Sequence, residues 1–213
     1  MSVGGADVHV WLTDRLWLRR PTLGDVDVVL RLHQEPLAIA HNPADTLAHH
    51  EQSTALVETW LQQWDEHGIG YCMVSWRCDV EVLGVCGVKV LTMNGLQVFN
   101  LLYRLSPPTW GQGVAIEAAA AVIERARHHR LALPVVARVR PDNQASAGVA
   151  LAAGLHRAPH LDTRGEDGPE EVYVSEPLGR DTGTRRPAPR WTVSLGDRLP
   201  KFRIGRSGPF RSP

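Results

Sequence analysis

A glycine-spaced loop between an expected strand and an expected helix is the stretch of this sequence best suited to chemistry. It covers Trp110 to Ala115 and follows a strand expected over Val98 to Leu105 and a turn at Pro107 and Pro108. Glycine lets a ligand approach the backbone closely, and the free N–H groups and dipole of a helix N-terminus favour negative charge. The spacing therefore suits a phosphate group, although glycines between a strand and a helix also form simple turns.

The helix after the loop is indicated by the spacing of its apolar residues. They form one helical stripe that runs towards Arg130, at Ala115, Ala119, Val122, Ile123 and Ala126. The sequence has neither the Gly-Lys-Ser/Thr ending of a P-loop nor the Gly-x-Gly-x-x-Gly fingerprint of a dinucleotide-binding turn. Those two classes of phosphate site are set aside.

The run from Tyr103 to Ala118 resembles the acetyl-CoA pyrophosphate loop of the GNAT acetyltransferase superfamily. It reads Tyr-Arg-Leu-Ser-Pro-Pro-Thr-Trp-Gly-Gln-Gly-Val-Ala-Ile-Glu-Ala. The branch of ribosomal-protein N-terminal alanine acetyltransferases has the similar pattern Tyr-x-Leu-x-Pro-x-x-Trp-Gly-x-Gly-x-Ala-x-Glu-Ala. A second match is Asn143-x-x-Ser146, before an apolar helix that ends at Gly154.

The resemblance implies a single α/β (α+β) domain over residues 14–176. Its mixed, mostly antiparallel sheet would have about six or seven strands with a V-shaped splay, flanked by about four helices. Periodicity and turn residues predict strands at 16–19, 69–76, 80–92, 97–105, 133–139, 155–161 and 172–175. They predict helices at 25–34, 47–67, 115–130 and 144–153, a broken helical turn at 36–46 and an acidic loop at 162–170.

The resemblance also implies which residues bind acetyl-CoA. The pantetheine arm would pair with an exposed strand edge, formed by Leu102, Tyr103, Arg104 and Leu105. The pyrophosphate would lie on the loop that follows, formed by Trp110, Gly111, Gln112, Gly113, Val114 and Ala115. Asn143 and Ser146 would meet the pantetheine arm or the thiol, and a backbone N–H near Tyr103 would polarise the thioester carbonyl. Tyr103 and Ser146 are the candidate catalytic residues, since either hydroxyl can relay a proton.

Two positions depart from the family pattern. Ala150 stands where many members have a tyrosine acid, and Asn100 stands where many have a glutamate base. The site is therefore predicted to lack a strong base, unless His33, His41 or His156 takes that role. A peptide α-amine, with a pKa of about 7.7–8.0, is neutral in roughly a quarter of molecules at pH 7.4, whereas a lysine amine is neutral in about one of a thousand. The expected acceptor is a peptide N-terminus or a small-molecule amine of similarly low pKa.

Two other functions stay open. Without the usual acid and base, the chain also fits a non-catalytic acyl-CoA-binding regulatory module. Residues 177–213 contain nine Arg or Lys and two Asp or Glu, and this Pro- and Gly-rich tail is predicted to be disordered and would suit an anionic partner. The formal net charge of the whole chain is +0, so no dedicated nucleic-acid binding is expected.

Membrane, metal and compartment predictions follow from what the sequence lacks. No apolar run approaches the roughly 20 residues of a membrane span, and the N-terminus has no signal pattern, so a cytoplasmic protein without a membrane partner is expected. Cys72 and Cys86 lie in apolar strand patterns and are predicted to be small buried residues. No metal is expected, because Cys and His residues lack ligand spacing. The oligomeric state, including a homodimer, is left open.

Overall fold

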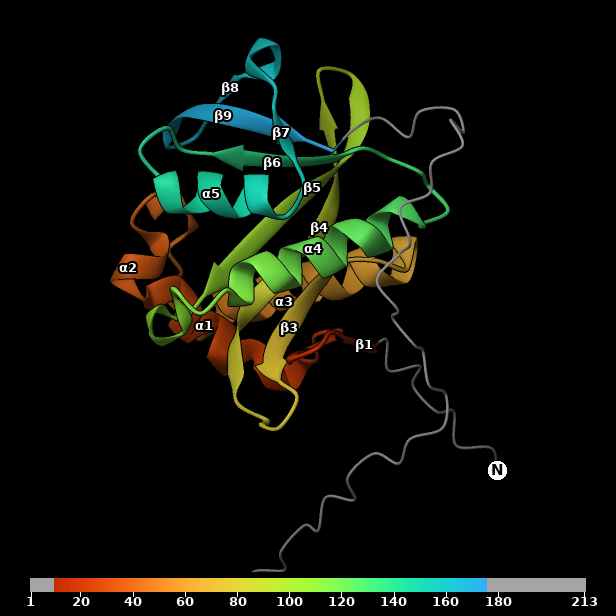
Figure 1. Ribbon diagram of the computed structural model, residues 1–213. Coiled ribbons are helices and arrows are strands. Elements are labelled where there is room, and N and C mark those ends of the chain that lie inside the picture. Colours follow the sequence, from red (N-terminus) through yellow and green to blue (C-terminus); the bar gives the residue numbers. More distant parts are fainter. Residues whose placement is uncertain (1–9, 176–213) are drawn as a thin grey trace, which may run out of the picture. The chain divides into compact units, whose positions relative to one another are not determined.

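The computed structural model describes residues 10–175 of the chain, and residues 1–9 and 176–213 lie outside the described part. The predicted basic tail, residues 177–213, falls outside it, so the domain boundary and the state of the tail stay predictions. The described residues form one mixed sheet with helices on both of its faces (Figure 1). An α/β fold with a mostly antiparallel sheet is therefore confirmed.

The sheet has nine strands among the described residues, in the order β1-β2-β3-β4-β5-β6-β9-β7, with β8 paired to β9. Their bounds are β1 (Val10–Leu12), β2 (Leu16–Arg19), β3 (Tyr71–Trp76), β4 (Val82–Met93), β5 (Leu96–Leu105), β6 (Val135–Val139), β7 (His156–Arg157), β8 (Thr163–Gly165) and β9 (Gly168–Val174). All paired strands run antiparallel except β5 and β6, which are parallel.

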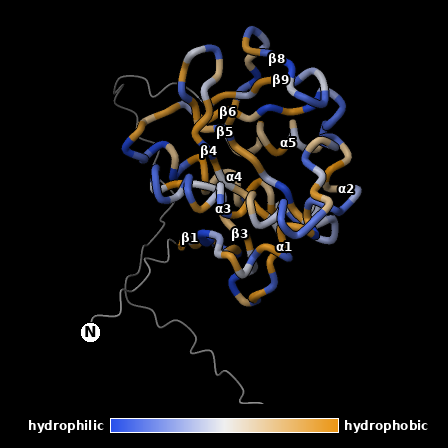
Figure 2. Tube along the Cα trace, turned by 180° about the vertical axis from the view of Figure 1, so that it is seen from behind, coloured by the Kyte–Doolittle hydropathy of each residue, from blue (hydrophilic) through white to orange (hydrophobic). Residues whose placement is uncertain are grey.

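The described helices cover the two faces of the sheet separately. They are α1 (Val26–Gln34), α2 (Pro36–Ile39), α3 (His50–His67), α4 (Val114–Arg127) and α5 (Gln144–Ala152). Helices α1 and α3 bury Val29, Val57 and Trp60 against β3 on one face. Helix α4 buries its predicted apolar stripe against β4 and β5 on the other face, where α5 also packs. Figure 2 shows the hydrophobic colour concentrated in the central strands and the hydrophilic colour in the outer loops.

Local signals in the sequence fix several of these elements. Asn94 and Gly95 both have positive φ, 51° and 79°, as a tight hairpin turn between β4 and β5 requires. Helix α3 ends at Gly68, whose φ is 73° and whose N–H donates to the Trp64 carbonyl. Trp60 and Trp64, four residues apart on α3, are 6% and 2% exposed and anchor the core. Both Cys72 and Cys86 are fully buried, as predicted.

The C-terminal part of the sheet differs from the sequence prediction. The stretch 162–170 is not a loop, since it contains β8 and the start of β9, which form a hairpin. Asp162 anchors this hairpin, because it accepts hydrogen bonds from Arg157 at 2.6 Å and from the backbone N–H of Val172 at 3.0 Å. The expected strand at 155–161 shortens to β7, because a 3₁₀ turn begins at Pro159 and proline donates no ladder hydrogen bond. The two strands beyond the predicted seven are the short β1 and β8, and the fifth helix is the four-residue α2, where a broken helical turn was predicted.

The sheet splays between β5 and β6. Their parallel register covers only the pairs Phe99–Val135 and Asn100–Val136. Beyond that point β5 continues to Leu105 along β4, whereas β6 follows β9. Figure 1 shows the two strands running apart, so the predicted V-shaped splay is confirmed. Among residues 10–175, no helix combines the length and the apolar character needed to cross a membrane.

Candidate active site

The loop from β5 to α4 leaves its backbone open where the sequence predicts a phosphate site. Gly111 and Gly113 have φ values of 73° and 76°, the left-handed region in which a side chain is strained. A Cβ atom on Gly111 would meet nothing within 4 Å, and one on Gly113 would meet only Arg15 Nη2, at 3.3 Å. The first intrahelical bond of α4 runs from the Glu117 N–H to the Gly113 carbonyl, at 3.0 Å. The amides of residues 114–116 precede that bond and have no acceptor within the helix, so they are available to an anion.

Two side chains of the loop brace its backbone. Trp110 is 49% exposed, and its Nε1–H donates to the Leu105 carbonyl at 2.9 Å. Gln112 donates from Nε2 to the Pro108 carbonyl at 2.8 Å. Both side chains therefore hold the loop in shape, and the ligand-facing groups that remain are backbone amides.

An ion pair that the sequence analysis missed ties this loop to the start of β2. Arg15 Nε lies 2.6 Å from Glu117 Oε2, and Arg15 Nη1 donates to the Gln112 carbonyl at 3.0 Å. The Arg15 backbone N–H and the Thr13 hydroxyl both donate to Glu117 Oε1. Burial alone would raise the pKa of Glu117, but these hydrogen bonds lower it below its usual value. Arg15 and Glu117 lie far apart in the sequence, so no local pattern marks the pair.

The two candidate catalytic residues, one on β5 and the other on α5, lie in contact. The Tyr103 hydroxyl donates to the Ser146 carbonyl at 2.8 Å, and the Ser146 hydroxyl donates to Tyr103 Oη at 3.0 Å. Asn143 caps α5 by accepting a hydrogen bond from the Ser146 N–H at 3.0 Å. Burial raises the pKa of Tyr103 to about 12, so its phenol stays protonated near neutral pH. Ala150 is fully buried, so this α5 position has neither a hydroxyl nor access to a ligand.

The other face of β5 carries Asn100, which is only 6% exposed. Its Oδ1 accepts a hydrogen bond from Arg138 Nε at 3.0 Å, and the same guanidinium donates from Nη1 to Glu170 at 3.0 Å. The amide is therefore fixed in place by a cation. An amide does not accept a proton near neutral pH, so Asn100 is not suited to act as a base.

Arg104 is buried on that same face, where it joins β5 to α1 and to the loop before α3. Its Nη2 pairs with Asp45, and its Nη1 lies 3.1 Å from His33 Nε2. His33 Nδ1 lies 2.7 Å from the Asp45 carbonyl, so a neutral ring donates from Nδ1 and accepts at Nε2. Burial, and next the Arg104 charge, lower the pKa of His33 to about 4. His33 is therefore a neutral structural group with both nitrogens engaged.

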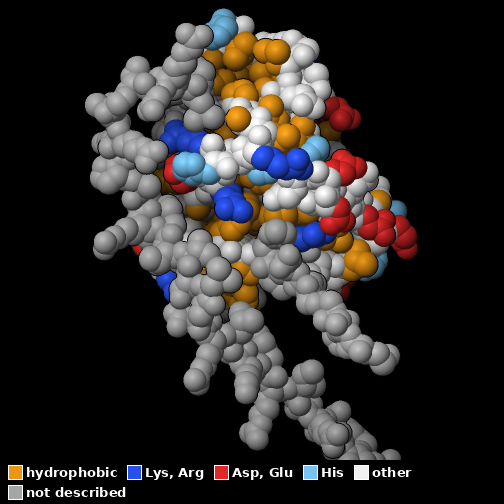
Figure 3. Space-filling view, turned by 90° about the vertical axis from the view of Figure 1, so that its right-hand side faces the viewer, with side chains coloured by type: hydrophobic (Ala, Val, Ile, Leu, Met, Phe, Trp, Pro, Cys, Tyr) orange, Lys and Arg blue, Asp and Glu red, His pale blue; other side chains and the backbone are white. Residues whose placement is uncertain are grey.

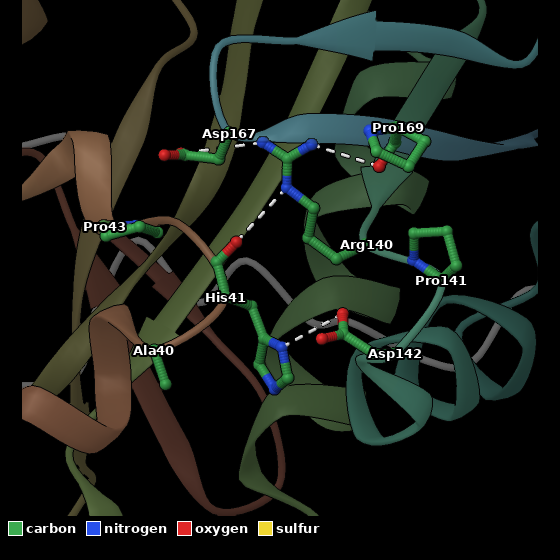
Figure 4. Close-up of a pocket in the computed structure, with 8 residues that line it drawn as sticks. All are labelled: Ala40, His41, Pro43, Arg140, Pro141, Asp142, Asp167 and Pro169. Atoms are coloured by element: carbon green, nitrogen blue, oxygen red, sulfur yellow. Dashed lines mark hydrogen bonds and ion pairs between the residues drawn. The ribbon is translucent and has the colours of Figure 1, made fainter.

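A pocket of about 370 Å³ opens beside this network. Its lining comes from the loop after α2, the end of β6 and the turn between β8 and β9, namely Ala40, His41, Pro43, Arg140, Pro141, Asp142, Asp167 and Pro169. Figure 4 shows Arg140 reaching between these walls, where it donates to the carbonyls of His41 at 3.2 Å and Pro169 at 3.1 Å. It also pairs with Asp167 at 3.5 Å. The three segments are therefore held together by one buried guanidinium.

Comparison with known proteins decides the family of this chain. A family model described as the acetyltransferase (GNAT) domain matches residues 15–156, more than half of the sequence. The chain belongs to this family. A curated relative, the uncharacterised protein YkkB of Bacillus subtilis (strain 168), is 29% identical over 101 residues. That match covers 46% of this chain and 59% of the relative.

Solved structures of acetyltransferases share the fold. One from Agrobacterium tumefaciens C58 has 23% identity and a TM-score of 0.67, covering 82% of this chain and 98% of its own. A GNAT-family protein from Bordetella pertussis has 16% identity and a TM-score of 0.68, covering 78% and 99%. RimL, a ribosomal L7/L12 α-N-protein acetyltransferase solved with coenzyme A, has 16% identity and a TM-score of 0.64, covering 78% and 97%. At these identities the likeness shows the fold alone.

The residues of the loop and the splay fit a ligand with a pyrophosphate and an extended arm. The open loop at Gly111 and Gly113 and the free amides at the start of α4 suit the phosphates. The end of β5 has no register pair with β6 beyond Asn100, which leaves one strand edge for the arm. Of the predicted binding residues, the side chains of Leu105 and Val114 are buried in the core, so only their backbone is available.

Within residues 10–175, no group of three His, Cys, Asp or Glu side chains is arranged to hold a metal ion. Figure 3 shows a face on which basic side chains are separated by hydrophobic and uncharged surface, with acidic side chains along one side. Such a pattern differs from the continuous basic stripe of a nucleic-acid site. The absence of a metal and of a nucleic-acid partner stays a prediction.

Proposed function

We propose that this protein transfers the acetyl group of acetyl-CoA to a primary amine by direct attack. The observation that carries the proposal is the continuous arrangement along β5. At the splay its end has no register pair with β6, its Tyr103 hydroxyl bonds to Ser146, and it leads into the open loop at Gly111 and Gly113. A loop for phosphates, an edge for the arm and a proton-donating hydroxyl therefore follow one another on a single segment.

In this proposal each predicted binding residue acts mainly through its backbone. The amides from Gly111 to Ala115 would hold the pyrophosphate, with Trp110 and Gln112 bracing the loop. The backbone of Leu102 to Leu105 would pair with the pantetheine arm, and Asn143 and Ser146 would border its thiol end. The Arg15–Glu117 ion pair supports this assignment, because it fixes the first turn of α4 against β2.

The chemistry proposed for the site needs an oxyanion donor, a proton donor and a neutral amine. A backbone N–H near Tyr103 would stabilise the oxyanion as the amine adds to the thioester carbonyl. Tyr103 stays protonated, because burial raises its pKa to about 12, so its hydroxyl can protonate the departing thiolate. Ser146 donates to Tyr103 Oη and so holds the phenol in place.

The proposed acceptor is an amine of low pKa, either a peptide N-terminus or a small molecule. Asn100 is held by Arg138 and has no base strength, so the site is poorly equipped to deprotonate a lysine ammonium. The structural neighbour RimL is named as an α-N-protein acetyltransferase, which is the same class of acceptor. This likeness supports the proposal only as a shared fold.

The test is coenzyme A release by the purified full chain, measured with a thiol reagent against a panel of peptides and small amines at pH 7.5. Release that depends on both acetyl-CoA and an α-amine supports the proposal. The alternative, a regulatory module that binds acyl-CoA without turnover, rests on Asn100 and Ala150. It predicts a raised melting temperature with acetyl-CoA and no release with any amine. The structure favours turnover, because Tyr103 and Ser146 supply the hydroxyl group that Ala150 cannot.

A further inference from the structure

His41 is a titratable group that the reaction described so far does not use. It lines the 370 Å³ pocket in the loop after α2, and its side chain is 37% exposed. Its Nδ1 lies 3.3 Å from Oδ1 of Asp142, which lies in the turn after β6 (Figure 4). A carboxylate on one imidazole nitrogen fixes the orientation of the ring and its tautomer. This is the arrangement of a histidine that accepts a proton at its other nitrogen.

Two of the segments that line the pocket are connected to the part of β5 where the acetyl group is proposed to lie. On one side, Asp45 follows Pro43 in the same loop and pairs with Arg104. On the other side, Asp142 directly precedes Asn143, and the helix that Asn143 caps contacts Tyr103 through Ser146. Tyr103 and Arg104 are adjacent in β5. Both walls of the pocket are therefore tied to the same point of the strand.

We propose that His41, oriented by Asp142, is the base that removes a proton from the acceptor ammonium. This inference rests on the proposed acetyl transfer. His41 takes one proton from the ammonium, and the neutral amine adds to the thioester carbonyl. A C–N bond forms and the C–S bond breaks. Tyr103 gives its proton to the departing thiolate, and the second amine proton passes from the nitrogen of the tetrahedral adduct to the Tyr103 oxygen. The products are the amide, coenzyme A and one proton on His41.

The other two candidate histidines fit this role less well. His33 is buried with both ring nitrogens engaged by Arg104 and Asp45. His156 lies on β7, whose partner strand is β9, and does not line the pocket. The sequence left these three histidines equivalent, and the fold brings only His41 into the pocket next to a carboxylate.

The charges around His41 come from three elements. Asp142 faces its ring, Arg140 donates to its carbonyl, and Asp167 lies across the pocket in the turn between β8 and β9. The Arg140 guanidinium is held by Asp167 and by the carbonyls of Gly168 and Pro169. The Arg140 charge is therefore engaged by its own partners, and the Asp142 carboxylate remains to attract an arriving ammonium.

The experiment compares the full chain with His41→Gln and with the matched control His50→Gln, by pH–rate profiles of kcat/KM from pH 5.5 to 9 with an α-amine peptide. His50 is also an exposed histidine paired with an aspartate, at 3.5 Å from Asp27, but it does not line the pocket. We expect His41→Gln to lower kcat/KM at pH 7 about a hundredfold and to change the pH dependence of kcat/KM. Asp142→Asn should lower kcat/KM less, and His50→Gln should leave both kcat/KM and its pH dependence unchanged.

A second readout separates this inference from the proposed function. Acetyl-CoA should raise the melting temperature of the parent, His41→Gln and His50→Gln equally, because His41 is placed on the acceptor side. If His41→Gln keeps the parent profile while acetyl-CoA binding and turnover persist, the base is not His41 and only this inference is overturned. If the parent neither binds acetyl-CoA nor releases coenzyme A, the proposed function fails and the inference fails with it.

Discussion

Replacing Gly113 by aspartate is the sharpest test of the phosphate loop. The left-handed φ of 76° costs a residue with a Cβ atom about 1 kcal/mol. For a domain of this size such a loss lowers the melting temperature by about 3 °C. The new carboxylate would lie beside Arg15 Nη2, which is 3.3 Å from the Cβ position. Because it would project from the loop that is proposed to hold the pyrophosphate, it would also lie close to that group. Two like charges at 4 Å near a protein surface repel by about 4 kcal/mol, part of which Arg15 would offset.

The expected result is at least a tenfold loss of acetyl-CoA affinity, which a thermal-shift assay can measure. Ligand at about 100 times its Kd stabilises the parent by about 2.7 kcal/mol, or roughly 8 °C. At the same ligand concentration a tenfold weaker Kd leaves about 1.4 kcal/mol, or roughly 4 °C. The ligand-induced shift should therefore halve or vanish in Gly113→Asp, beyond the small drop of the unliganded protein.

Gly68→Asp is the matched control. Gly68 has nearly the same φ, 73°, and a Cβ atom there would meet nothing within 4 Å, but the residue ends α3 and lies outside the loop. Without ligand, Gly68→Asp should lower the melting temperature about as much as Gly113→Asp. With acetyl-CoA, its melting temperature should rise as much as that of the parent. Equal ligand shifts in the two variants would refute the placement of the pyrophosphate at Gly113.

Three further predictions follow from the hydrogen bonds and pKa shifts of the site. Tyr103→Phe should lower kcat tenfold to a hundredfold and leave the acetyl-CoA thermal shift intact, and an unchanged kcat would remove the phenol from the mechanism. Glu117→Gln should cost about 1–2 kcal/mol at pH 7. Because hydrogen bonds lower the folded pKa of Glu117, this cost should disappear as the pH falls through that value, and a cost independent of pH in thermal melts would contradict it. His33 has a folded pKa of about 4, below its unfolded value, so its contribution is present above pH 6.5 and is lost as the pH falls to 4. The free energy of unfolding should therefore fall by about 3 kcal/mol at most between pH 7 and pH 4 because of this group. In His33→Gln this fall should be smaller when urea denaturation is followed over the same pH range, and an equal fall would refute the reasoning.

The sequence determined the features that depend on neighbouring residues. The run from Tyr103 to Ala118 is continuous, so its strand, loop and helix are visible in order, together with the family resemblance. Asn94 and Gly95 set the β4–β5 turn because their backbone conformation is a property of the residues themselves. The spacing of apolar residues likewise set the buried face of α4. The loop predicted at 162–170 was wrong. Polar residues favour loops on average, but here β8 and β9 pair as a hairpin.

The tertiary structure decided which distant polar groups meet. Arg15 and Glu117 form an ion pair across the fold, and Arg104 joins His33 to Asp45, although neither set has any spacing in the sequence that marks it. The histidines carry the clearest case. In the sequence His33 and His41 are both candidate bases, but folding buries the first between a cation and a carbonyl and places the second in a pocket next to Asp142. The type of a side chain is written in the sequence, whereas its burial and its charged neighbours, which determine whether it can exchange a proton, exist only once the chain has packed.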